Sequence, residues 1–211
     1  MNNAIVLVFL FIPVFLLATA FTRIFIILSF LKKGLGDIGV PSGQILFGLS
    51  LLFSFIVMRE PLQEIYTKSF IPYSEGKKKG SEFLEESERP LRTFMAAQVS
   101  SADLDFVKKY TQSPNAQNEN IKDLGVESQT PFLTLLGAFT LSELKKGLLM
   151  GFLLWIPFLI IDLLVSTFIS TMGLASFSSS LVSLPLKILL FLAIDGWKLL
   201  FGGIAESYWV R

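Results

Sequence analysis

Two carboxylates, Asp162 and Asp195, lie within otherwise apolar stretches of the sequence. Ionisable groups inside a membrane often mark a proton or ion pathway, and these two residues would support that chemistry. A proton relay usually brings more than two such groups, often with histidine, and the chain has no histidine. We therefore favour a structural role, in which the carboxylates bond to backbone or pair with Lys187, Lys198 or Arg23 where helices meet.

Arg23 follows Thr22 inside the first apolar stretch. One interpretation is that it lines a pore. The favoured interpretation is that it snorkels or pairs near the end of a helix, because Lys32 and Lys33 lie beyond it. Together with Asp162, Lys187 and Asp195, Arg23 is predicted to be a polar intramembrane residue that supports assembly.

The segment 172–183 lies between two apolar blocks and is rich in small residues and serine. Glycine and serine supply the backbone chemistry of a simple turn between helices. A flexible apolar constriction that excludes water fits the same composition, because hydrophobic constrictions gate channels by dewetting. Composition alone leaves both interpretations open.

Catalytic constellations are absent from the sequence. Without His or Cys the chain has no Ser-His-Asp triad, no thiol nucleophile, no disulfide and no imidazole or thiolate metal site. There is no phosphate-binding glycine loop. The acidic residues between 82 and 88, beside Arg89 and Arg92, fit a solvated helix face. We predict a protein that is not an enzyme and needs no metal or cofactor.

The composition favours a membrane protein. Of the 211 residues 52% are hydrophobic, 21 are Phe and only 17% are charged, which points to lipid or to a large buried interface. The net charge of +1 offers no face for nucleic acid.

Apolar blocks and one polar insert divide the chain. The blocks cover residues 4–31, 45–58, 148–171 and 184–205, and the insert follows the second block. We predict an all-α, membrane-associated fold in which two helical hairpins flank a helical insert. The predicted domains are an N-terminal hydrophobic hairpin (1–58), the polar insert (59–130) and a C-terminal hydrophobic hairpin (131–211).

Short loops and turn residues predict the topology. The Gly- and Pro-rich connector after Lys32 and Lys33 joins two helices, and lysines in a short loop favour the cytoplasmic side. The insert would then be periplasmic. Within it we expect helices over 81–110, with Pro90 starting the second one, and a mobile loop over 112–127. The first apolar block has no basic residue before it, which favours a retained membrane segment over a cleaved signal.

The four blocks are poor lipid spans. The second has about 14 residues, against the roughly 20 that a spanning helix needs. The other three contain ionisable residues, and each charge at the bilayer centre costs about 3 kcal/mol on insertion scales. Pro13, Pro157 and Pro185 leave backbone carbonyls that need outside partners. These helices should prefer protein neighbours, so the chain is built to assemble.

Motifs in four regions, in order along nearly the whole chain, resemble the FliP/SctR family of type III protein export gates. They are residues 21–24 (FTRI) with 31–36 (LKKGLG), 90–95 (PLRTFM) with 102–104 (ADL), 138–145 (AFTLSELK) with 151–152 (GF) and 156–163 (IPFLIIDL), and 183–187 (SLPLK) with 195–197 (DGW).

The resemblance implies a core subunit of the export gate in the bacterial inner membrane, within the basal body. Family members form a homo-oligomer, usually a homopentamer, with two smaller membrane subunits of the FliQ/SctS and FliR/SctT kinds. The complex contacts further export-apparatus proteins, is lifted largely out of the lipid plane with lipid at its periphery, and surrounds a closed channel for unfolded flagellar or virulence proteins.

The family also implies a methionine-rich gasket after the third block, and here the sequence departs from the pattern. Met172 is present, but Leu174, Ala175 and Phe177 stand among the positions where methionines would follow. These four residues are the gate candidates, and we expect Leu174 and Phe177 to carry the seal.

Two choices remain from the sequence. Residues 22–24 and 74–95 are closer to the flagellar branch, whereas the lack of a signal peptide is closer to the virulence branch, and we favour the flagellar one. The alternative function is a stand-alone ion- or proton-coupled transporter or channel that uses Asp162 and Asp195.

Overall fold

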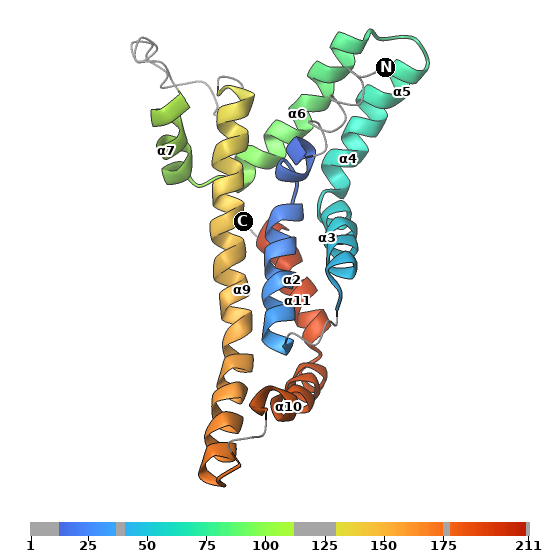
Figure 1. Ribbon diagram of the computed structural model, residues 1–211. Coiled ribbons are helices and arrows are strands. Elements are labelled where there is room, and N and C mark those ends of the chain that lie inside the picture. Colours follow the sequence, from blue (N-terminus) through green and yellow to red (C-terminus); the bar gives the residue numbers. More distant parts are fainter. Residues whose placement is uncertain (1–12, 37–40, 112–129, 175–177, 210–211) are drawn as a thin grey trace, which may run out of the picture. The chain divides into compact units, whose positions relative to one another are not determined.

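Helices account for every regular element that the structure describes. The computed structural model describes residues 13–36, 41–111, 130–174 and 178–209, and no strand occurs within these ranges. The elements are α2 (Phe21–Leu35), α3 (Gly43–Val57), α4 (Arg59–Ile65), the π-helix η1 (Tyr66–Phe70), α5 (Ile71–Ser74), α6 (Gly80–Gln98), α7 (Ser101–Thr111), α9 (Phe132–Thr171), α10 (Ser179–Ala193) and α11 (Gly196–Trp209). The predicted all-α class is confirmed (Figure 1).

The chain folds into two compact units that each combine distant segments. Unit 1 comprises residues 1–22 and 52–145, and unit 2 comprises residues 23–51 and 146–211. The domains predicted from the sequence separate apolar hairpins from the polar insert. Their boundaries, at residues 58 and 130, stay a prediction. The interpretation of residues 4–18 falls mostly, and that of 112–127 wholly, outside the described residues.

Helix α9 is the one described helix whose own length and apolar composition suffice to cross a membrane. It has 40 residues, which is about 60 Å at 1.5 Å per residue. Two bent pairs also pass the same test of composition: α3 with residues 59–74, bent by 72°, and α10 with α11, bent by 60°. Counting each bent pair as one span gives three candidate spans in the described residues.

The core of unit 1 forms where α6 packs on the first part of α9. Its buried side chains are Ala18, Met95, Leu135, Leu136 and Phe139. The rings of Phe94 and Phe139 meet edge to face at 5.9 Å, and Arg92 donates to the Thr130 carbonyl at 2.6 Å just before α9 begins. These contacts join the insert to the long helix.

The expectation that Pro90 starts a new helix is wrong. Helix α6 runs unbroken through Pro90, whose side chain is buried. Proline removes one hydrogen bond, to the carbonyl of Glu86, but packing of an amphipathic face supplies most of a helix's stability in a protein. Because α6 packs on α4 and η1, one missing bond does not end it.

Glycines let α2 and α9 approach closely in unit 2. A side chain at Gly147 would meet the Arg23 backbone at 3.3 Å, and one at Gly151 would meet the Phe30 ring at 2.6 Å. The two glycines form a G-x-x-x-G pattern, which places small residues on one helix face at successive turns. The sequence 147–151 is therefore a close-packing surface for α2.

Candidate functional site

A polar cluster joins α9 to α10 within unit 2. Lys187 donates to one Asp162 carboxylate oxygen at 2.7 Å, and the Ser183 hydroxyl donates to the other at 2.6 Å. Lys187 is only 3% exposed and Ser183 is fully buried, whereas the Asp162 side chain is 41% exposed. The carboxylate thus neutralises a lysine that is buried in an apolar helix, and this pairing is among those the sequence left open.

The cluster brackets the segment proposed as the gate. Helix α9 ends at Thr171, and Gly173 just beyond it has a φ of 72°, which suits glycine. The Leu174 amide donates back to the Ile169 carbonyl at 3.2 Å. Met172 and Leu174 are exposed. Ala175 and Phe177 lie outside the described residues. The gate role of all four residues stays a prediction.

Arg23 is completely buried in unit 2 rather than extended to a surface. Its guanidinium donates to the Ser207 hydroxyl at 2.8 Å and lies 3.9 Å from the centre of the Tyr208 ring. The snorkelling interpretation is wrong, because α11 supplies polar and aromatic partners inside the fold. The paired interpretation describes the contact, while a role of Arg23 in assembly stays a prediction.

Asp195 forms the elbow between α10 and α11 and is exposed. Its φ of 52° is left-handed, a conformation that aspartate tolerates better than most residues. Its carboxylate lies 3.8 Å from the Lys198 ammonium, and both side chains are mostly exposed. Asp195 is not the partner of Lys187, which pairs with Asp162. The fourth block is thus broken at a charged elbow.

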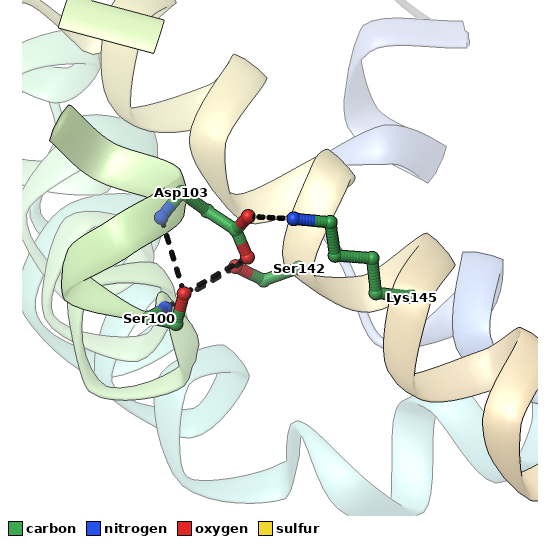
Figure 2. Close-up of polar contacts among 4 residues, drawn as sticks. All are labelled: Ser100, Asp103, Ser142 and Lys145. Carbon is green, nitrogen blue, oxygen red and sulfur yellow. Dashed lines mark hydrogen bonds and ion pairs between the residues drawn. The ribbon is translucent and has the colours of Figure 1, made fainter. Parts of the chain in front are cut away.

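A second polar cluster, which the sequence did not predict as a site, joins α7 to α9 in unit 1 (Figure 2). The Asp103 carboxylate accepts hydrogen bonds from Ser142 at 2.7 Å and Ser100 at 2.9 Å, and it pairs with Lys145. The Asp103 amide donates to the Ser100 hydroxyl at 3.2 Å. The spacing of Ser100 and Asp103 is that of a helix capping box, which is the one sequence signal that marks this cluster.

The surroundings of Asp103 stabilise its ionised form. Burial raises the pKa of the carboxyl group, but hydrogen bonds from Lys145, Ser142 and Ser100 and the positive charge of Lys145 lower it. The pKa lies below its ordinary value as a result. Asp103 therefore stays charged at neutral pH and clamps α7 to α9.

The clamp should make unit 1 acid-sensitive. Because the folded-state pKa lies below the unfolded one, the stabilisation is complete above the ordinary Asp pKa of about 3.9 and is lost as the pH falls through the lowered value. We expect Asp103→Asn to cost about 2 kcal/mol at neutral pH and to flatten this acid dependence. Thermal unfolding of the full chain between pH 7 and pH 2 measures both effects.

Asp105 provides the matched control on the same helix, since its side chain is exposed. Asp105→Asn should leave the stability of the full chain at neutral pH unchanged. Equal pH profiles for wild type and Asp103→Asn would contradict the clamp.

The described surface exposes many large apolar side chains. Among residues 13–36, 41–111, 130–174 and 178–209, no group of three or more Asp, Glu, His or Cys is arranged to hold a metal. Large apolar side chains are instead exposed along both helices that flank the 172–178 segment, among them Leu149, Phe152, Leu163, Leu164, Phe168, Leu181, Leu189 and Leu192.

Comparisons with known proteins match almost the whole chain to one family. The FliP family model matches residues 5–204. The "Flagellar biosynthetic protein FliP" of Pectobacterium carotovorum subsp. carotovorum is 38% identical over 194 residues, which cover 92% of this chain and 72% of that protein. The protein of the same name from Bacillus subtilis (strain 168) is 34% identical over 195 residues, covering 92% and 85%.

Relatives differ in length. The Buchnera aphidicola subsp. Baizongia pistaciae protein of the same name is 38% identical over 200 residues, which are 94% of this chain and 53% of that protein. The chain thus spans from about half to most of the length of the relatives it matches. With a family match from residue 5 to residue 204, this chain belongs to the FliP family.

Proposed function

We propose that the chain is a core subunit of the flagellar type III export gate in the bacterial inner membrane. It acts without catalysis, as part of the wall of a gated conduit for unfolded export substrates. Several copies, five in the arrangement that the family resemblance implies, assemble with two smaller helical membrane subunits. The polar insert faces the periplasm in this proposal.

One observation carries this proposal beyond family membership: the α10–α11 pair is unsuited to lipid as it stands. Its exposed apolar side chains, such as Leu192 and Leu199, surround an elbow where Asp195 and Lys198 are exposed. A charged elbow in hydrocarbon is costly, whereas neighbouring protein helices or a water-filled channel accept it. The pair therefore fits a surface that other subunits cover.

The stand-alone transporter gains no support from the two carboxylates. Asp162 is bonded to Lys187 and Ser183, and Asp195 has its own partner at an exposed elbow. Neither arrangement forms a chain of protonatable groups across the described residues.

Deleting the chain in its own host tests the proposed function. We expect flagellar subunits to be made but not exported, and expression of the wild-type chain from a plasmid to restore export. The double variant Leu174→Gly/Phe177→Gly should restore export and let small ions leak into the cell, because two apolar groups of the seal are gone. Secreted flagellar protein and membrane conductance are the measurements.

The two halves of this test fail separately. Export that continues in the deletion strain would contradict the export function. Unchanged ion leakage in the double variant would contradict only the seal at Leu174 and Phe177. Leu181→Gly, an exposed leucine of α10 beyond the proposed seal, is the matched control.

A further inference from the structure

Three aromatic side chains form an exposed row along the helix of residues 59–74, which comprises α4, η1 and α5. Tyr66, Phe70 and Tyr73 are 56%, 48% and 46% exposed, and we call them the aromatic stripe. The rings of Tyr66 and Phe70 stack at 5.7 Å with an angle of 18° between their planes. Aromatic residues usually bury much of their surface, so an ordered exposed row indicates something that covers it.

The other faces of the same helix have their roles already. Ser69 is fully buried, and η1 and α4 pack against α6. Glu64 and Lys68 form an ion pair one turn apart, which neutralises the charged face. The aromatic stripe thus contains the exposed large apolar side chains of this helix, although the Tyr73 ring also lies 5.1 Å from the Phe83 ring of α6.

If α3 lies in the bilayer, the bend that follows it directs the helix of residues 59–74 toward the membrane plane. Helix α3 has 15 residues and is about 22 Å long, shorter than a hydrocarbon core of about 30 Å. The helix of residues 59–74 follows at once and is bent by 72° from α3. Membrane helices tilt by about 20° from the bilayer normal on average, so a bend of this size directs the next helix close to the membrane plane.

The chemistry of the aromatic stripe matches the boundary between headgroups and acyl chains. Tyrosine places its ring in the apolar layer and its hydroxyl in the wet layer, which is why tyrosine is enriched at that depth. Exposed apolar side chains of α3, such as Leu52 and Phe55, precede the stripe in the chain, and the exposed charged residues Arg59 and Glu60 lie between them. This change from apolar to charged side chains at the end of α3 is typical of the edge of a bilayer, which favours lipid over a separate protein partner.

We propose that the helix of residues 59–74 is an interfacial helix, whose aromatic stripe rests on the lipid bilayer before partner subunits cover the chain. The inference does not depend on the export function. It divides the polar insert into a lipid-bound first helix and the water-facing remainder from α6 onward.

The absence of cysteine in the chain makes the test clean. Single cysteines at positions 66, 70 and 73 carry a nitroxide label, in the full chain reconstituted alone into phosphatidylethanolamine–phosphatidylglycerol nanodiscs. Collision with oxygen reports lipid, and collision with a water-soluble nickel chelate reports water. We expect labels on the stripe to be several-fold less accessible to nickel than a label at Lys68, which lies on the charged face of the same helix.

Two results would overturn the proposal. Equal nickel accessibility on both faces would place the stripe in water. Labels that lose nickel accessibility only after other membrane subunits are added would make the stripe a protein interface. Unchanged helix content by circular dichroism shows that each cysteine variant is folded, and labels at Tyr66 and Tyr73 give the result independently of Phe70.

Discussion

Asp162→Asn is expected to destabilise unit 2 by about 3–5 kcal/mol, because it leaves the buried ammonium of Lys187 without a counter-charge. The variant keeps the shape of the side chain, so packing is hardly changed. Lys187→Met should cost clearly less, since the carboxylate that remains is 41% exposed and can be solvated. Chemical or thermal unfolding of the purified chain in mild detergent measures both.

The double variant Asp162→Asn/Lys187→Met separates charge from packing. We expect it to be close to Lys187→Met alone, so that the second substitution adds almost nothing. Asp195→Asn is the matched control, because that carboxylate is exposed and 3.8 Å from its partner, and asparagine tolerates the same left-handed backbone. Additive losses, or a cost for Asp195→Asn equal to that for Asp162→Asn, would contradict the assignment.

Gly151→Leu is expected to force α2 away from α9 and to cost about 3 kcal/mol or more. Even the first side-chain atom at this position would lie 2.6 Å from the Phe30 ring, and the base of that ring is also within 3.1 Å, so Phe30 cannot simply swing aside. Cysteine crosslinking between α2 and α9, together with unfolding in detergent, measures the separation and the loss.

Gly202→Leu is the matched control, because it also replaces a glycine within a helix by leucine. Nothing lies within 4 Å of a side chain added at Gly202, so the change should be neutral or slightly stabilising through better helix propensity. If the Gly151→Leu variant were as stable to unfolding as the Gly202→Leu variant, close packing of α2 and α9 would not explain the glycine at position 151.

The all-α fold follows from local properties of the sequence. Apolar blocks separated by glycine and proline predict helices and their ends, and the left-handed elbow at Asp195 lies where the fourth block is interrupted. Pro90 misled the prediction because packing on α4 and η1 outweighs one lost backbone bond. Helix α9 begins at Phe132, 16 residues before the third apolar block and next to the start of the hairpin predicted over residues 131–211.

The polar clusters could be predicted only in part. Aspartate and lysine in neighbouring apolar blocks favour a pair, and Asp162 with Lys187 is that pair. The Asp103 cluster joins residues 39 positions apart, a contact that no local pattern contains. Burial of Arg23 depends on α11 folding back to it across 184 positions. These contacts depend on packing between helices that are far apart in the chain. Such packing leaves no periodic pattern in a single sequence.

The polar groups of unit 2 fall into two kinds, those with partners inside the chain and those that are exposed. Arg23 and Lys187 each have a polar partner inside the chain, Ser207 and Asp162 respectively. Exposed polar groups on apolar helices, at Asp162 and at the Asp195 elbow, are the ones that favour protein or water over lipid. The apolar side chains around them supply the packing surface.

Co-purification with the two small helical subunits in mild detergent, followed by mass measurement of the intact species, tests the central claim most directly. Helices with charged elbows and bent spans should pack against the helices of other subunits. The predicted mass is therefore that of several copies of the chain bound to both partners. Recovery of the chain only as a lone monomer of 23.5 kDa, with neither partner bound, would contradict it.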